Sequence, residues 1–327
     1  MHVSQLRLDP MTGRWVVIAG ERAQRPSDFL PRRLPVEDDP LRPCPFCPGS
    51  RLDPVLECRG PDGEWDVRVV PNLYPAFSGN DPMVVTHLGP VFTQAPASGV
   101  HDVVILSPDH NVSWADLEAD HAARIMSAIK LRMLEHSQLP GLRYSQAVVN
   151  SGREAGASIE HPHGQLLSMP FIPGEAANEL AGFARFQGNC LLCAVMEAET
   201  EEGHRVVYAD DRVVMICPFW SGTPYEMLLM PRSHDIHLYE ADDEDLAAMG
   251  RSVQLALDSL RFRLGDVAYN LMFHSAPFRT SADFHWHVHV VPKISTRGGF
   301  EMGSGVLINV VPPERAADDL RSSFAHA

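Results

Sequence analysis

The residues best suited to chemistry lie in the segment His161-Pro-His163-Gly-Gln165. A neutral imidazole is abundant near pH 7, and its attack on phosphorus divides one difficult group transfer into two easier steps. On an extended chain, residues i and i+2 point the same way, so His161, His163 and Gln165 share one face. His163 is therefore the candidate nucleophile. The amide of Gln165 can donate to a phosphoryl oxygen as charge develops there, and Gly164 would let a phosphate approach closely.

A Cys-x-x-Cys pair precedes this segment, and a histidine lies between the two. Together they supply two thiolates and two imidazoles, the ligand set of a tetrahedral zinc site: Cys44, Cys47, His110 and His161. Four protein ligands leave no open position, so this zinc is expected to be structural and to fix the strand that presents His163. The alternatives are a redox pair for the cysteines and a role as a further metal ligand for His163.

A second set of the same composition follows later in the chain: Cys190, Cys193, His234 and His285. These residues predict a second metal site. Four others could compete for the same ion, namely Glu179, His274, His287 and His289. In His285-Trp-His287-Val-His289, alternation places three imidazoles on one face, and the sequence leaves His287 open as a second nucleophile.

The order of these landmarks repeats. His110 and His161 are 51 residues apart, and so are His234 and His285. In both halves the order is Cys-x-x-Cys, apolar strand (103–106; 227–230), histidine, helix, second strand (147–149; 269–273) and histidine cluster. Ser113 with Asp116, and Asp242, are the expected helix caps. The fold class is therefore α+β, with two similar halves, each a mainly antiparallel sheet with a packed helix. The expected domains are 1–178 and 179–327, joined by 170–179.

Composition narrows the function. The net charge is −15 with no dense basic run, which disfavours nucleic acid as a partner but leaves room for a small anionic substrate. No apolar stretch approaches the roughly 18 residues of a membrane-spanning helix, and the first residues lack a secretory pattern. We therefore expect a soluble cytoplasmic protein. The glycine-rich loop from Asn150 to Ser158, with Arg153, suits a phosphate cradle built from backbone N–H groups.

The alternating histidines resemble the histidine-triad superfamily. The Cys-Pro-Phe-Cys, Ser-Pro-Asp-His110 and His161-Pro-His-Gly-Gln165 segments resemble galactose-1-phosphate uridylyltransferases over nearly the whole chain. The resemblance implies a homodimer that exchanges a uridylyl group between UDP-glucose and galactose 1-phosphate, with His163 as nucleophile and Gln165 holding the phosphoryl group. It implies zinc as the cofactor, and a nucleotide sugar and a sugar phosphate as partners. The substrate-binding positions that it implies are Arg22, Arg25, Asn72, Asn150, Gly156 and Ser158.

Two departures point to a branch of that family. The second Cys-x-x-Cys pair is present together with the glutamate and histidines that well-known members use for their second metal. The segment from Gly299 to Gly305 stands where those members hold sugar hydroxyls. Both features resemble the ADP-glucose phosphorylases, which transfer an adenylyl group to phosphate with the same histidine chemistry. A nucleotide hydrolase and a non-catalytic zinc module are the remaining alternatives.

Overall fold

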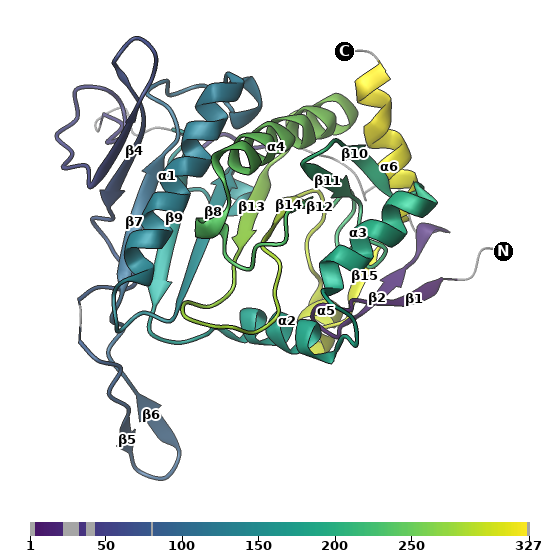
Figure 1. The fold of residues 1–327 in the computed structure, drawn as a ribbon, viewed down its shortest axis with the longest axis horizontal. Coiled ribbons are helices and arrows are strands. Elements are labelled where there is room, and N and C mark those ends of the chain that lie inside the picture. Colours follow the sequence, from purple (N-terminus) through teal and green to yellow (C-terminus); the bar gives the residue numbers. More distant parts are fainter. Residues whose placement is uncertain (1–3, 22–32, 37–42, 80, 326–327) are drawn as a thin grey trace.

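The computed structural model describes residues 4–21, 33–36, 43–79 and 81–325. A twisted ten-stranded sheet crosses the molecule, and all its neighbouring strands are antiparallel (Figure 1). Its first five strands, in spatial order, are β3 (Leu56–Arg59), β4 (Trp65–Pro71), β7 (Val100–Ile105), β9 (His163–Met169) and β8 (Tyr144–Ser151). The other five are β13 (Tyr269–His274), β14 (His287–Pro292), β12 (Met227–Pro231), β11 (Val213–Ile216) and β10 (Val206–Ala209).

The two halves of the sheet have the same strand order, arranged as mirror images about the centre of the sheet. In each half, from the outer edge to the centre, the first three strands lie in chain order, and the fifth strand lies between the third and the fourth. The fourth strands, β8 and β13, pair at the centre, with Asn150 opposite Asn270 and Val149 opposite Leu271. The α+β class with mainly antiparallel sheets is confirmed. The sequence predicts one sheet for each half, whereas the structure joins both into a single sheet through this central pair.

Two long helices cover one face of the sheet: α1 (Ala119–Ser137) and α4 (Asp243–Leu264). They pack against each other and bury the main apolar core, which includes Ile125, Met133, Leu166, Met249, Leu257, Leu271 and Val290. Asp242 caps α4 as predicted, since its side chain accepts a hydrogen bond from the backbone N–H of Asp245. The predicted cap at Ser113 is wrong for α1. Ser113 caps a short 3₁₀ turn, Trp114–Asp116, and Leu117 is then extended, so α1 begins only at Ala119.

The opposite face is covered mainly over the C-terminal half, by α2 (Gly174–Arg185) and α3 (Leu191–Glu202). A small sheet of β1 (Gln5–Leu8), β2 (Trp15–Ile18) and β15 (Leu307–Asn309) lies beyond them, with α5 (Gly299–Ser304) (Figure 1). Helix α6 (Pro313–Arg321), near the end of the chain, packs instead against α4 and β10 (Val206–Ala209). A Cβ added at Gly182 would lie 1.8 Å from the carbonyl oxygen of Met11, so only glycine lets α2 pack this closely on the N-terminal segment.

A hairpin of β5 (Thr86–Leu88) and β6 (Phe92–Gln94) stands away from the body (Figure 1). Its apolar side chains are exposed, with Val91 at 74% and Phe92 at 67%. Such a patch on a projecting arm is typical of an interaction surface. Among the described residues, no helix has the length and apolar character needed to span a membrane.

Candidate active site and metal centres

Strand β9 presents His163 and Gln165 on the sheet face opposite α1 and α4. In the register of the sheet, His163 lies beside Ile105, and Gln165 lies between Val103 and Val148. Gly164 points the other way: a Cβ there would meet the carbonyl oxygen of Val148 at 2.9 Å and a methyl of Val149 at 3.2 Å. Glycine is therefore needed for packing between strands, and the close approach of a phosphate to Gly164 stays a prediction.

His163 is held in the form that a nucleophile needs. Its Nδ1 lies 2.8 Å from the carbonyl oxygen of His161, and because a carbonyl only accepts, Nδ1 carries the ring proton. The lone pair is then on Nε2. Burial lowers the pKa of His163, which keeps the ring neutral near pH 7. The ring of Phe46 packs against it, with centroids 5.2 Å apart.

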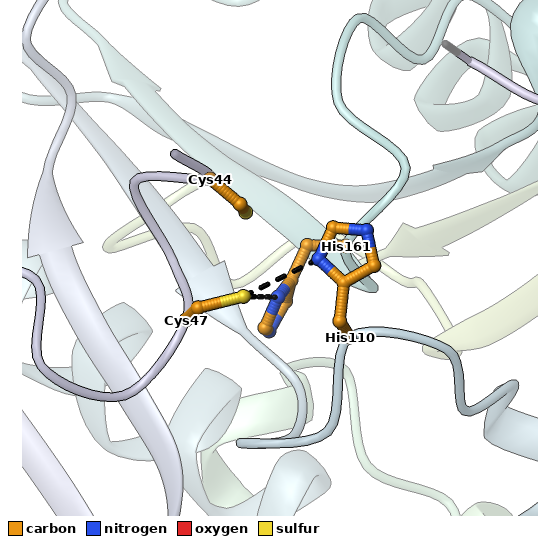
Figure 2. Close-up of side chains that lie close together, drawn as sticks. All are labelled: Cys44, Cys47, His110 and His161. Carbon is orange, nitrogen blue, oxygen red and sulfur yellow. Dashed lines mark hydrogen bonds between the residues drawn. The ribbon is translucent and has the colours of Figure 1, made fainter. Parts of the chain in front are cut away.

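The first predicted metal group assembles beside this strand. The donor atoms of Cys44, Cys47, His110 and His161 all lie within 4.8 Å of one another (Figure 2). Cys47 Sγ is 3.3 Å from His110 Nδ1 and 3.6 Å from His161 Nδ1. His161 Nε2 donates to the carbonyl oxygen of Ser107 at 2.8 Å, which leaves Nδ1 as the ligand atom. Two sulfurs and two imidazole nitrogens at this separation fit a tetrahedral zinc ion.

The second predicted group has the same construction. Cys193 Sγ lies 3.4 Å from His234 Nδ1 and 3.5 Å from His285 Nδ1, and Cys190 completes the set. His285 Nε2 donates to the carbonyl oxygen of Pro231 at 2.9 Å, as His161 does to Ser107. Burial and the neighbouring thiol of Cys190 raise the pKa of Cys193 to about 12, so a cation is needed to hold the sulfur of Cys193 as a thiolate near neutral pH. The donors fit zinc.

The competing residues form a separate third group, so the two sets do not exclude each other. The ligand atoms of Glu179, His274, His287 and His289 also lie within 4.8 Å of one another. His274 Nδ1 is 2.8 Å from Glu179. Burial alone would raise the pKa of Glu179, but the neighbouring histidines, His274 first, lower it to about 2. The Nε2 atoms of His287 and His289 are buried and have no hydrogen-bond partner in the described part of the chain, which suits metal ligands.

His287 repeats the local geometry of His163, because its Nδ1 lies 2.8 Å from the carbonyl oxygen of His285. Its surroundings differ. His287 is fully buried, and its Nε2 is enclosed with Glu179 and His274. This environment suits a ligand of the third group better than it suits a nucleophile that an incoming substrate must reach.

The predicted phosphate loop begins where β8 ends. Gly152 and Gly156 adopt φ values of 85° and 90°, and a 3₁₀ turn, Arg153–Ala155, lies between them. The side-chain nitrogen of Asn270 donates to Asn150 Oδ1 at 2.7 Å and to the carbonyl oxygen of Ala155 at 2.8 Å. Asn150 therefore turns its own nitrogen toward Gly156, where a Cβ would lie 3.9 Å from it. Gly156, Ser158 and Arg153 are exposed. Arg22 and Arg25 lie outside the described residues.

The side chains of Asn72 and Gln165 both contact His101, a residue that was not predicted from the sequence. His101 Nε2 lies 2.9 Å from Gln165 Oε1 and 3.2 Å from Asn72 Nδ2. Asn270 was missed as well. The sequence signal at each position is a polar residue inside a mostly apolar strand, Val-His-Asp-Val-Val-Ile and Tyr-Asn-Leu-Met-Phe. That signal does not say what the residue contacts.

The chain matches two models of one protein family along most of its length. The model of the galactose-1-phosphate uridyl transferase N-terminal domain matches residues 1–173, and that of the C-terminal domain matches 177–321. An ADP-glucose phosphorylase of Arabidopsis thaliana is 33% identical, over 97% of this chain and 92% of the relative. A galactose-1-phosphate uridylyltransferase of Thermotoga maritima is 28% identical, over 98% of both chains.

Solved structures agree with these matches. The crystal structure of an ADP-glucose phosphorylase from Arabidopsis thaliana with bound ADP-glucose superimposes with a TM-score of 0.83, at 31% identity over 98% of both chains. A uridylyltransferase structure superimposes with a TM-score of 0.78, at 26% identity over 99% of both chains. Two family models thus cover nearly the full length of the chain, and full-length relatives share its fold. The chain belongs to the galactose-1-phosphate uridyl transferase family.

Proposed function

We propose that the protein transfers a uridylyl group from UDP-glucose to galactose 1-phosphate through a covalent His163 intermediate. The observation that carries this proposal is the orientation of His163: Nδ1 is tied to the carbonyl oxygen of His161, so the lone pair of Nε2 is free to attack. Nε2 attacks the α-phosphorus, and the bond from that phosphorus to the bridging oxygen of glucose 1-phosphate breaks. A phosphate oxygen of galactose 1-phosphate then displaces Nε2, which forms UDP-galactose and restores the imidazole.

Neighbouring groups serve the same two displacements. The amide of Gln165 lies two residues along the same strand face, where it can donate to a non-bridging oxygen of the transferred group. The nitrogen of Asn150 and the turn at Gly156 face the space where further phosphate oxygens would lie. A zinc ion held by the first metal group would fix His161, and with it the carbonyl oxygen that orients His163.

An adenylyl transfer with inorganic phosphate as acceptor is the second candidate. The specific observation in its favour is that the Arabidopsis ADP-glucose phosphorylase is 33% identical, against 28% for the Thermotoga maritima uridylyltransferase. The acceptor phosphate oxygen would displace Nε2 of His163 in the same way, so the covalent chemistry is common to both candidates and only the base and the acceptor differ.

Labelling with a nucleotide sugar tests both candidates. UDP-glucose and ADP-glucose, each with radioactive α-phosphorus, are mixed with the protein without any acceptor. The proposal predicts an acid-labile, alkali-stable label that is absent from His163→Ala and present in His287→Ala. The donor that labels faster identifies the base, and release by galactose 1-phosphate or by inorganic phosphate identifies the acceptor. No label from either donor, in protein that contains its zinc, would contradict the covalent mechanism and favour a hydrolase or a binding module.

The remaining features of the assembly belong to the same proposal. The halves 1–178 and 179–327 act as two domains, one with the nucleophile and one with the second Cys-x-x-Cys site. Zinc occupies both Cys2His2 sets.

Two copies of the chain form a homodimer through the exposed apolar side chains of the β5–β6 hairpin. All six cysteines are free and four of them are arranged as metal ligands, which suits a reducing compartment and supports a cytoplasmic location.

A further inference from the structure

His101 lies near the start of β7 and its side chain is buried, with 8% of the residue exposed. Three polar groups surround its ring. The backbone nitrogen of Ala76 is 3.0 Å from Nδ1, Gln165 Oε1 is 2.9 Å from Nε2, and Asn72 Nδ2 is 3.2 Å from Nε2. The backbone of Asn72 is tied to the same residue, since its N–H donates to the carbonyl oxygen of His101 at 2.9 Å. The ring therefore stands between two residues of the proposed substrate site.

The ring proton can be assigned from one of these contacts. A backbone N–H only donates, so the contact with Ala76 makes Nδ1 an acceptor. A neutral imidazole carries one N–H, which must then be on Nε2. Nε2–H in turn requires an acceptor from Gln165, and Oε1 is the only acceptor in that side chain. The opposite amide orientation would place the NH₂ of Gln165 against the ring N–H. We propose that His101 is a positioning residue that turns the NH₂ of Gln165 toward the transferred phosphoryl group.

The same proton acts on Asn72. The Oδ1 atom of Asn72 accepts a hydrogen bond from the backbone N–H of Tyr74 at 2.8 Å, so its Nδ2 is the atom that faces His101. A protonated Nε2 has no lone pair to offer. The 3.2 Å contact is therefore not a hydrogen bond, and the Nδ2 hydrogens of Asn72 remain for a ligand. One ring tautomer thus leaves two amide groups with donors that a nucleotide can use.

This inference rests on the proposed function, because it assigns Gln165 a donor role toward a phosphoryl oxygen. Among the described residues, the amide nitrogen of Gln165 has no hydrogen-bond partner, so its hydrogens are available on the face that it shares with His163. Removal of one preorganised donor of this type slows reactions about 10²- to 10³-fold in other enzymes. A flipped amide would present an oxygen in its place and would lose the same interaction.

Two variants of matched shape test the role of the ring proton. The amide of His101→Gln can present an N–H at the position of Nε2, whereas His101→Glu presents only acceptors and forces Gln165 to turn its NH₂ inward. Single-turnover labelling by the nucleotide sugar is expected to remain within about threefold of wild type for His101→Gln. It is expected to slow by at least about 10-fold for His101→Glu, with little change in KM, because the donor acts mainly in the transition state. Equal rates for the two variants would overturn the proposal.

Glutamate also adds a charge, and a control separates this effect from amide orientation. The control repeats His101→Gln and His101→Glu in a Gln165→Met protein, which has no amide at position 165 to orient. The two double variants should then label at equal rates, and a persistent 10-fold gap would show that charge or folding, rather than amide orientation, caused the loss. Nitrogen chemical shifts of ¹⁵N-histidine, with His101→Gln used to assign the signal, should show a protonated Nε2. A protonated Nδ1 would overturn the inference. The chemical-shift measurement does not depend on enzyme activity, so it tests the ring tautomer independently of the proposed function. The proposed function would be contradicted by the absence of any label on the wild-type protein.

Discussion

The side-chain nitrogen of Asn270, in the C-terminal half, donates a hydrogen bond of 2.7 Å to Asn150, in the N-terminal half. The two residues are direct neighbours in the central strand pair, and a second hydrogen bond from the same nitrogen holds the carbonyl oxygen of Ala155 at 2.8 Å. The loop proposed to bind phosphate is therefore shaped by both halves. The C-terminal half thus contributes to the site that contains His163, although its own His287 and His289 belong to the third metal group.

Replacement of Asn270 by alanine should slow labelling by the nucleotide sugar about 10-fold. The change leaves Asn150 and Ala155 each without a partner, and an unsatisfied buried polar group costs about 1–3 kcal/mol. Asn270→Asp should be slower still, since a carboxylate can only accept and would face two other acceptors. Single-turnover labelling measures both effects. Asn178→Ala, on the exposed surface of α2, is the matched control and should behave as wild type. An Asn270→Asp protein as fast as wild type would contradict the role.

The candidate site could be predicted from the sequence where chemistry and spacing determine it. Cysteine pairs and histidines in a repeated order indicate metal groups whatever the exact fold, and the structure brings both predicted sets together. The alternation in His161-Pro-His163 requires only that the segment be extended. His101 and Asn270 could not be predicted in the same way. Their contacts depend on which strand lies beside which, and the register between β7 and β9 or β8 and β13 is set by packing over the whole sheet.

The fold shows the same division. Apolar strands and long amphipathic helices follow from residue patterns, and Asp242 caps its helix as predicted. The error at Ser113 arose because a capping sequence is equally compatible with a short 3₁₀ turn, and the chain straightens at Leu117 before α1 starts. The fusion of two sheets into one was not predictable either, since the edges of β8 and β13 look alike whether they pair with each other or are covered by something else.

Metal analysis of cysteine variants should distinguish the two Cys2His2 sets. Cys47→Ser and Cys193→Ser are each expected to contain one zinc equivalent fewer than wild type, because Cys47 and Cys193 each contact both histidines of their set. Cys47→Ser should also slow labelling, since His161 is then no longer fixed beside His163. Cys193→Ser should mainly lower the thermal midpoint. Cys58→Ser, a half-buried cysteine outside the metal groups, is the control. Unchanged zinc in both test variants would rule out these ligand sets.

Stability in acid should depend on Asp102. This carboxylate is 1% exposed, and it lies 2.7 Å from Arg132 and 3.3 Å from His136. Burial acts to raise its pKa, but hydrogen bonds from His136 and Arg132 outweigh burial and lower the pKa below 3.8. The unfolded chain therefore takes up a proton at higher pH than the folded one. The stabilisation by ionised Asp102 is complete above pH 3.8, and it is lost as the pH falls through the pKa of Asp102 in the folded protein.

Asp102→Asn should accordingly be less stable than wild type at neutral pH, by about 3 kcal/mol, because Arg132 loses a buried partner. The difference in unfolding free energy between the two proteins should decrease as the pH falls below 3.8, since Asp102 of the wild type then becomes protonated and also loses its charge. Urea unfolding of both proteins over this range measures the difference. Metal loss in acid affects the two alike and cancels in the comparison. A gap that stays constant with pH would show that shape, rather than the charge of Asp102, stabilises the fold.

The β5–β6 hairpin should control assembly. Its exposed Val91 and Phe92 would be covered in a homodimer, and a stable interface buries about 1,200–2,000 Å² in total, which an arm reaching across to a second copy can supply together with the body. Phe92→Asp places a charge in that interface and should convert the dimer to a monomer in light scattering, with an unchanged circular dichroism spectrum. Leu131→Asp, on the exposed side of α1, makes the same kind of change away from the arm and should leave the dimer intact. If Phe92→Asp stays dimeric, the contact between copies must lie elsewhere, and the arm is then free to contact the substrate or another protein instead.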